Sequence, residues 1–194
     1  MWVVVLIKGF DVAKQRLSPA LDGVARERLA RHNARLALAA ARAGDAVLAV
    51  CGSGQAAELA RLAGAETLLE ADPKGQNPAA RRGIQHALSR GAGAVLLLSS
   101  DLPLVTRAAI AGMIAFARRL PSPAALAAPA SGRGGTNALY LAPPDALGLH
   151  FGDDSLAEFT AEAHRKGVEF RLYRSRALAL DLDEPDDLAA MEAV

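Results

Sequence analysis

The chain lacks most of the features that mark secreted, zinc-binding and nucleic-acid-binding proteins. Its 194 residues include one cysteine, Cys51, so an internal disulfide and any zinc site built from several cysteines are excluded. Aromatic residues make up 4% of the chain, and 22 basic residues against 21 acidic ones leave a net charge of +1. Nucleic acids and membrane surfaces are bound by basic patches, often with interleaved aromatics. We therefore expect neither nucleic acid nor a membrane among the partners of this protein.

Several chemical signatures are absent as well. The four histidines show no metal-binding spacing such as H-x-x-x-H, and nothing resembles a Ser-His-Asp or Cys-His arrangement. The first strand-like run is followed by neither the P-loop pattern G-x-x-x-x-G-K-[ST] nor the dinucleotide-binding pattern G-x-G-x-x-G. The apolar run at residues 1–7 is much too short for a membrane span and has no charged leader, which predicts a cytoplasmic protein.

Strand-like and helix-like segments alternate along the chain, and hydrophobic residues, at 52%, suffice for a sizeable core. Short apolar runs predict strands at 3–7, 46–51, 66–70, 94–99, 124–128, 137–141, 168–173 and 177–182. Helical periodicity and stop signals predict helices at 24–43, 55–63, 78–90, 106–119, 155–166 and from Pro185 onward. The alternation predicts a mixed but mainly parallel central sheet with helices on both faces. Residues 1–194 would thus form a single three-layer α/β/α domain.

Three cations follow the first predicted strand within nine residues: Lys8, Lys14 and Arg16. In an open α/β sheet, ligands lie beyond the carboxyl ends of the parallel strands. Cations in this place could surround a polyphosphate. The alternative is a solvated loop with ordinary surface side chains.

Carboxylates follow two other predicted strands. Asp101 ends the most apolar run, before a proline-containing loop, and suits either a Mg²⁺ site beside a nucleotide or a plain turn. Asp181 and Asp183 are two residues apart on a predicted strand, so both would point the same way and repel each other unless a cation intervened. Asp186 and Asp187 belong to a first helical turn, where the helix dipole explains them.

Two further segments combine glycines with hydroxyl side chains. Thr136 follows a glycine-rich loop that permits close approach to a phosphate or carboxylate, although a flexible hairpin loop is the alternative. Ser155 and Glu158 form a capping-box pattern, which is a sufficient structural reason for both. A helix start also attracts anions, but Asp153 and Asp154 would oppose one unless they face away or touch a metal.

The order of these motifs resembles the CofC/FbiD family of guanylyltransferases in coenzyme F(420) biosynthesis. The resemblance spans nearly the whole chain. It rests on an apolar strand ending in Lys, then K-x-R-L, G-x-N, D-L-P-L, G-T-N-A-L, F-G-x-x-S and L-D-L-D-x-P-x-D-L. It implies a compact nucleotidyltransferase fold of the nucleotide-diphospho-sugar transferase type. That fold is similar to the molybdenum-cofactor guanylyltransferases but lacks their glycine-rich first loop.

The resemblance also implies roles for four groups of residues. Mg²⁺, the expected cofactor, would be coordinated by Asp101, Asp181 and Asp183. The phosphorylated three-carbon acid would be held by Thr136, Gly152 and Ser155. The GTP phosphates would meet the catalytic cations Lys8, Lys14 and Arg16. The nucleotide would lie near Gly75, Gln76 and Asn77.

The implied reaction transfers GMP from GTP, the co-substrate, to the phosphate of phosphoenolpyruvate or 2-phospho-L-lactate. The acceptor oxygen attacks the α-phosphorus in line and expels pyrophosphate. This needs positioning and charge neutralisation but no protein nucleophile, which agrees with the absence of a nucleophile–base pair. A homodimer and hand-over of the product to a downstream transferase are compatible with this interpretation.

Three alternatives stay open at this point. Asp153, Asp154 and Pro78 depart from the family pattern and could mark another acceptor, such as 3-phospho-D-glycerate. The chain could also be a molybdenum-cofactor or sugar-phosphate nucleotidyltransferase, which the missing glycine-rich loop disfavours. A non-catalytic nucleotide-binding protein of the same fold is the third. The three predicted metal-binding carboxylates argue against it, because a scaffold would not need them.

Overall fold

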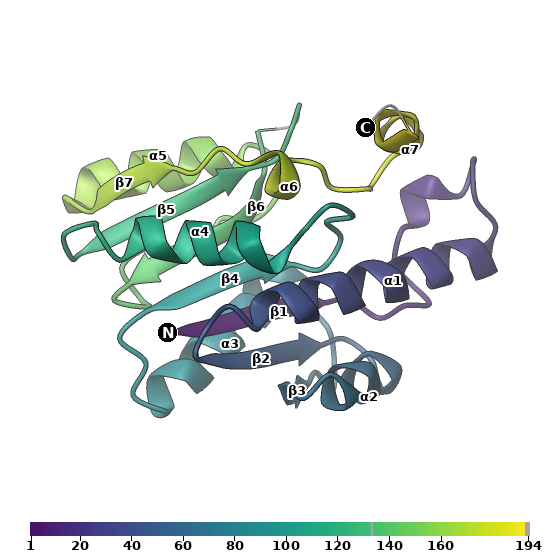
Figure 1. Ribbon diagram of the computed structural model, residues 1–194, viewed down its shortest axis with the longest axis horizontal. Coiled ribbons are helices and arrows are strands. Elements are labelled where there is room, and N and C mark those ends of the chain that lie inside the picture. Colours follow the sequence, from purple (N-terminus) through teal and green to yellow (C-terminus); the bar gives the residue numbers. More distant parts are fainter. Residues whose placement is uncertain (133, 193–194) are drawn as a thin grey trace.

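The computed structural model describes residues 1–132 and 134–192, and a seven-stranded sheet forms its centre (Figure 1). The strands are β1 (Trp2–Ile7), β2 (Ala46–Cys51), β3 (Glu66–Leu69), β4 (Val95–Ser99), β5 (Ala124–Pro129), β6 (Thr136–Ala142) and β7 (Glu169–Leu172). They lie in the order β3-β2-β1-β4-β6-β5-β7. β6 runs antiparallel to β4 and β5, and the other neighbouring pairs are parallel. The predicted mixed, mainly parallel sheet is confirmed.

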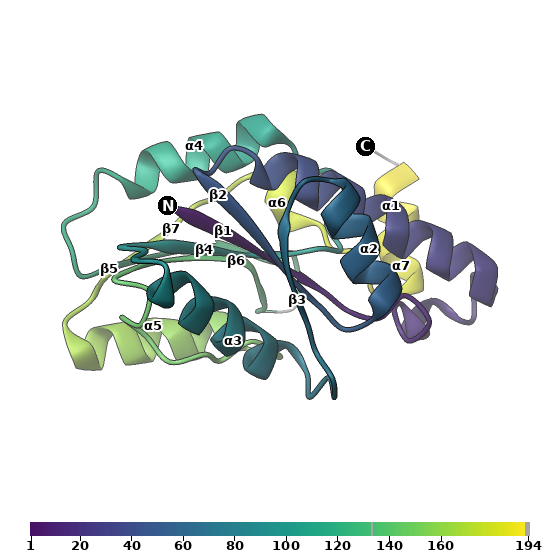
Figure 2. The ribbon, with the colours of Figure 1, turned by 90° about the horizontal axis from the view of Figure 1, so that it is seen from below.

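Helices cover both faces of this sheet. They are η1 (Gln15–Leu17), α1 (Gly23–Ala41), α2 (Gly54–Leu62), α3 (Gln76–Ser89), α4 (Arg107–Ala117), α5 (Ser155–Lys166), α6 (Arg176–Ala179) and α7 (Pro185–Glu192). α1, α2 and α4 lie on one side of the sheet and α3 and α5 on the other (Figure 2), which confirms the three-layer arrangement. α3 begins two residues before its predicted start at Pro78. Among the described residues, no helix combines the length and the apolar composition needed to cross a membrane.

The interior strand β1 is packed tightly on both faces. Val3 and Val5 belong to the apolar cluster beneath α1 and α4, whereas Val4 and Leu6 belong to the cluster beneath α3 and α5. Successive side chains of a strand face opposite sides, so a strand covered on both faces is apolar throughout. A Cβ atom on Gly83 of α3 would lie 2.5 Å from Val4 Cγ1, so this glycine lets α3 approach β1 closely. The packing fixes where the loop after β1 leaves the sheet.

The segment 177–182 is not the strand that its apolar residues predict. It forms part of the short helix α6 and then an irregular stretch, in which Leu178 and Leu182 are buried. The nearest strands, β5 and β6, already have two partners each in the sheet, so neither offers a free edge. Instead, the Asn137 side-chain amide donates hydrogen bonds to the carbonyls of Leu178 and Ala179, at 2.9 and 3.2 Å. The segment therefore crosses the end of the sheet near the residues that follow β4.

Candidate active site

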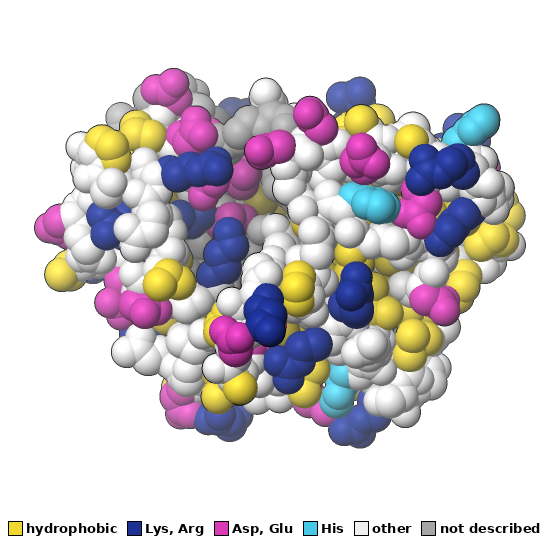
Figure 3. Space-filling model, turned by 180° about the vertical axis from the view of Figure 1, so that it is seen from behind, with side chains coloured by type: hydrophobic (Ala, Val, Ile, Leu, Met, Phe, Trp, Pro, Cys, Tyr) yellow, Lys and Arg dark blue, Asp and Glu magenta, His cyan; other side chains and the backbone are white. Residues whose placement is uncertain are grey.

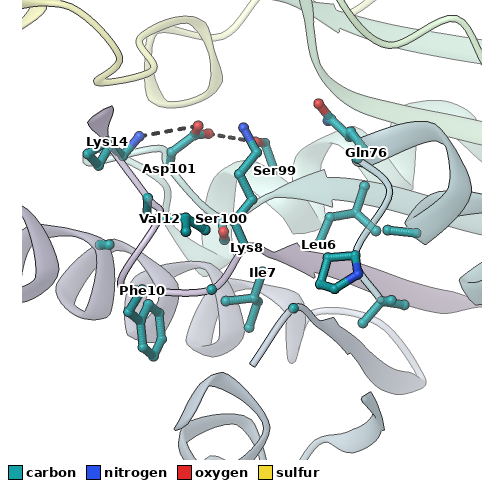
Figure 4. Close-up of a pocket in the computed structure, with 18 of the residues that line it drawn as sticks. Leu6, Ile7, Lys8, Phe10, Val12, Lys14, Gln76, Ser99, Ser100 and Asp101 are labelled. Atoms are coloured by element: carbon teal, nitrogen blue, oxygen red, sulfur yellow. Dashed lines mark hydrogen bonds and ion pairs between the residues drawn. The ribbon is translucent and has the colours of Figure 1, made fainter. Parts of the chain in front are cut away.

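A cavity of about 260 Å³ opens at the carboxyl ends of β1, β2 and β4, where ligands bind in open α/β sheets (Figure 4). The predicted residues that line it are Lys8, Lys14, Gly75, Gln76, Asp101 and Asp183. The predicted residues that do not line it are Arg16, Asn77, Thr136, Gly152, Ser155 and Asp181. The space-filling view in Figure 3 shows a hollow in its upper left, and basic and acidic side chains border it. The fold thus brings half of the predicted set to one cavity.

An ion pair between a buried lysine and a partly buried aspartate lies at the end of β4. Lys14 Nζ is 3.3 Å from Asp101 Oδ2, and the Lys14 side chain is 5% exposed. Lys14 also donates to the carbonyl of Leu182, and the Ser99 hydroxyl donates to Asp101 Oδ1. Burial would raise the pKa of the Asp101 carboxyl, yet the charge of Lys14 and the Ser99 hydrogen bond lower it. The charge of Lys8 acts in the same direction, and Lys8 points toward this group in Figure 4.

The backbone at Lys14 adopts an unusual conformation. Its φ is +59°, and among the described residues only one other non-glycine residue, Asp154 with φ +54°, has a positive φ. Few non-glycine residues have such values, and they persist where the surrounding structure enforces them, often at functional sites. Lys14 precedes η1 at the cavity and Asp154 precedes α5. Both unusual residues therefore lie in segments that the sequence singled out for ligand binding.

The C-terminal segment carries Asp183 to the cavity. The N–H of Leu182 donates to the carbonyl of Asp101 at 3.2 Å, which ties this segment to the end of β4. The Asp183 carboxylate lies 3.4 Å from the Arg16 guanidinium, which is also 3.5 Å from Glu184. Arg16 is 61% exposed in its side chain, so this contact is open to solvent. Arg16 therefore stands beside the cavity without lining it.

The strand that would make Asp181 and Asp183 point the same way is absent, so that prediction is wrong. The residues that follow this segment begin the helix α7 instead. α7 begins where predicted and carries Asp186 and Asp187 in its first turn. Asp187 Oδ2 accepts the N–H groups of Asp183 and Glu184, at 2.9 and 2.7 Å. The structural role predicted for Asp187 is confirmed.

Two of the three carboxylates predicted to bind Mg²⁺ are placed where they could share such an ion. The part of the chain that the structure describes holds no group of three or more His, Cys, Asp or Glu side chains arranged for a metal ion. Asp101 and Asp183 nevertheless border the same cavity, whereas Asp181 does not. In nucleotide sites Mg²⁺ is usually held by one or two carboxylates together with phosphates and water. Asp101 and Asp183 therefore fit an ion that is shared with a triphosphate.

Thr136 and Ser155 form a buried hydroxyl pair. Ser155 Oγ donates to Thr136 Oγ1 at 3.1 Å, and the two residues are 1% and 6% exposed. Thr136 begins β6, and the antiparallel register places that end of β6 beside the carboxyl end of β4.

The capping box predicted for Ser155 and Glu158 is wrong. Asp154 occupies the N-cap position of α5 without a side-chain hydrogen bond, and the Ser155 hydroxyl is engaged by Thr136 instead.

Asn77 joins the start of α3 to the loop that carries Gly152. Its side-chain amide donates to the carbonyl of Phe151 at 3.0 Å and accepts the N–H of the same residue at 2.8 Å. Gly152 has a φ of +138°, a conformation that L side chains rarely adopt. Both ends of the Asn77 amide are thus occupied by the backbone of this loop. Gly75 and Gln76, by contrast, line the cavity directly.

Sequence reasoning missed three residues around the cavity. Ser99 hydrogen-bonds Asp101, Asn137 holds the C-terminal segment, and Glu70 lines the cavity after β3. A signal existed for each. Ser99 and Glu70 end predicted strands, and Asn137 follows Thr136 within the same motif. More of the polar residues at the strand ends could therefore have been predicted as part of the site.

Comparison with known proteins shows which family and which proteins the chain is similar to. Residues 1–192 match the family described as guanylyl transferase CofC like. The phosphoenolpyruvate guanylyltransferase of Rubrobacter xylanophilus is 40% identical over 195 residues, which cover 100% of this chain and 94% of that protein. The 2-phospho-L-lactate guanylyltransferase of Methanothermobacter thermautotrophicus is 32% identical over 186 residues, 95% of this chain and 81% of that protein.

A solved structure supports the same fold at lower identity. A nucleotidyl transferase from Methanothermobacter has a TM-score of 0.69 at 17% sequence identity, over 99% of this chain and 95% of that one. At this identity the likeness shows the fold alone, which is that of the nucleotidyltransferases. The family match covers nearly the whole chain, so the protein belongs to the guanylyl transferase CofC-like family.

Proposed function

We propose that this protein transfers GMP from GTP to the phosphate of a small phospho-acid, phosphoenolpyruvate or 2-phospho-L-lactate, and releases pyrophosphate, in coenzyme F(420) biosynthesis. The observation that carries the proposal is one cavity bordered by Lys8, Lys14 and Asp101 in a chain of this family. Relatives named for both acceptors support the reaction class. Phosphoenolpyruvate is the preferred candidate because the 40% identical relative is named for it.

The reaction forms one phosphorus–oxygen bond and breaks another. An oxygen of the acceptor phosphate attacks the α-phosphorus of GTP in line, and pyrophosphate leaves with the electron pair of the broken bond. No protein nucleophile is required. In keeping with this, neither a histidine nor a cysteine is among the cavity-lining residues. The protein's task is to position the two anions and to neutralise their charge.

Lys8 and Lys14 supply that neutralisation in two ways. Lys14 is fixed by Asp101 and by the Leu182 carbonyl, so its charge is already placed before the nucleotide binds. Charges that need no reorganisation stabilise a transition state most effectively. Lys8 points into the same space from the end of β1 (Figure 4). Arg16, which is exposed and beside the cavity, would add a third cation for the leaving pyrophosphate.

Asp101 and Asp183 would hold Mg²⁺ together with the triphosphate. The ion, when bound, would screen the negative charge of the triphosphate from the approaching acceptor. Asp183 is held in place by the contact of its carboxylate with Arg16 and by the hydrogen bond from its N–H to Asp187. Asp181, the third ligand that the resemblance implies, stays a prediction.

The acceptor would lie by Thr136, Ser155 and Gly152. Thr136 accepts the hydrogen bond from Ser155 and keeps its own hydroxyl hydrogen to donate to a phosphate or carboxylate, and α5 presents its N-terminus beside the pair. Asp154 lies against Gly134, where an added Cβ would come within 2.9 Å of its carboxylate oxygen. The acidic residues before α5 keep 3-phospho-D-glycerate as an alternative acceptor, since a carboxylate could bind its extra hydroxyl.

The test is pyrophosphate release with Mg²⁺ and GTP, offering phosphoenolpyruvate, 2-phospho-L-lactate and 3-phospho-D-glycerate separately. We expect turnover with phosphoenolpyruvate or 2-phospho-L-lactate. An Asp154→Ala variant with unchanged acceptor preference would remove the reason for considering 3-phospho-D-glycerate. GTP binding by folded protein without turnover on any of the three would contradict the proposal and favour a nucleotide-binding role.

A further inference from the structure

Glu70 places a carboxylate in the cavity that nothing in the reaction described above uses. The residue follows β3, lines the cavity and is 9% exposed. Its backbone N–H donates to the carbonyl of Cys51 at 2.9 Å, which fixes its position relative to β2.

This carboxylate also lacks a partner. Within the described part of the chain it forms neither a hydrogen bond nor an ion pair. Burial raises the pKa of the Glu70 carboxyl, and the charge of Arg82 opposes that rise only in part. The Glu70 oxygens are not among the buried side-chain atoms of the described residues that lack a partner, so they are open to the cavity, where a ligand can reach them. A ligand with hydrogen-bond donors at this end of the cavity would supply the missing partners.

The distance across the cavity suits a nucleotide. Glu70 and Asp101 follow β3 and β4, which lie three positions apart in the sheet. Neighbouring strands are about 4.8 Å apart, so the backbones of the two residues are separated by roughly 14 Å along the sheet edge. A nucleotide with its phosphates at Lys8 and Asp101 would reach Glu70 with the far edge of its base. Val50 of β2, the strand beside β3, and Ala79 of α3 give the cavity apolar walls that suit a flat ring.

We propose that Glu70 is the residue that selects guanine, by accepting hydrogen bonds from N1–H and from the 2-amino group of the base. This rests on the proposed function insofar as GTP is the nucleotide. Guanine presents two adjacent donors on this edge, which two carboxylate oxygens can accept together. Adenine and cytosine present one amino donor beside a ring-nitrogen acceptor, and uracil presents one N–H between two carbonyls. None of these three offers the matching pair.

The experiment compares GTP with ITP, whose base keeps N1–H and lacks the 2-amino group. Equilibrium binding of each is measured calorimetrically for the wild type, for Glu70→Gln and for Glu58→Gln. The last is a matched control, because Glu58 is exposed on α2 and outside the cavity. We expect the wild type and the control to bind GTP about 10-fold more tightly than ITP, the effect of one charge-assisted hydrogen bond. Glu70→Gln should bind GTP about 10- to 100-fold more weakly than the wild type does, and it should no longer bind GTP more tightly than ITP.

Two results would overturn the inference. One is equal binding of GTP and ITP by the wild type, which needs no variant at all. The other is weakening of both nucleotides by the same factor in Glu70→Gln, which would place the carboxylate on the ribose. Pyrophosphate release by the wild type is measured in parallel. Its absence would count against the proposed function, while the GTP/ITP ratio still decides the role of Glu70.

Discussion

The two parts of the candidate site hold their polar groups differently. Around Lys14 and Asp101, opposite charges lie 3.3 Å apart in a partly buried setting. Around Thr136 and Ser155, the buried groups are neutral hydroxyls 3.1 Å apart. Charges interact strongly where water is scarce, whereas hydroxyls mainly give direction. The first part is therefore suited to neutralise a triphosphate, and the second to orient an acid that brings its own charge.

The largest effect is expected from Asp101→Asn, which attacks the charged part directly. The change leaves Lys14 buried without its counter-charge and removes a proposed Mg²⁺ ligand. We expect kcat/KM to fall by about 1000-fold, the scale of losing one preorganised electrostatic group. Pyrophosphate release measures the effect, and Asp186→Asn on the exposed side of α7 is the control. A loss below about tenfold would show that neutralisation does not depend on this carboxylate.

The hydroxyl pair should respond with a change in acceptor binding alone. Thr136→Val and Ser155→Ala each remove one partner of the same hydrogen bond. We expect each to raise the KM for phosphoenolpyruvate about 10-fold and to leave the KM for GTP unchanged. Because the residues are in contact, the double variant should lose less than the two single losses combined. Steady-state kinetics with each substrate varied in turn tests this. An equal rise in both KM values would erase the distinction between the two parts.

A smaller effect is expected where the two parts are joined. Asn77→Ala removes the two hydrogen bonds that tie α3 to the Phe151 backbone. We expect a loss of about 1–2 kcal/mol in the free energy of unfolding and a several-fold rise in the acceptor KM. Chemical denaturation and acceptor kinetics measure both. Gln85→Ala, an exposed amide on the same helix, is the control and should change neither.

The same division explains how far the sequence was informative. Strands β1, β2 and β4 are continuous apolar runs in a two-sided core, so their ends, and with them Lys8 and Asp101, were predictable. The run at 177–182 has a similar pattern, but there it buries Leu178 and Leu182 individually against strands that are already paired. Ser155 was misassigned for a related reason. Local spacing cannot reveal that a residue 19 positions away competes for its hydroxyl.

Glu162 of α5 lies outside both parts. Replacing it tests whether charge holds the loop before α5 in place. Its carboxylate contacts His150 Nε2 at 2.6 Å and Lys166 Nζ at 2.8 Å, and it accepts the N–H of Gly148. Burial would raise the pKa of this carboxyl, but the hydrogen bond from Lys166, the Gly148 N–H and His150 lower it to about 2. The ordinary value is 4.5. The depressed pKa means that the folded protein favours the charged form.

The sign of the pH dependence follows from that difference. The stabilisation by Glu162 is complete above pH 4.5 and is lost as the pH falls from 4.5 toward about 2. A shift of this size corresponds to about 3 kcal/mol at neutral pH. We therefore expect Glu162→Gln to lower the free energy of unfolding by about 2–3 kcal/mol at pH 7 and by progressively less toward pH 3, with activity at pH 7 almost unchanged. Denaturation curves across this range measure the effect. A difference that is independent of pH would mean that the loop is held by packing, because only a titrating carboxylate makes the two proteins converge in acid.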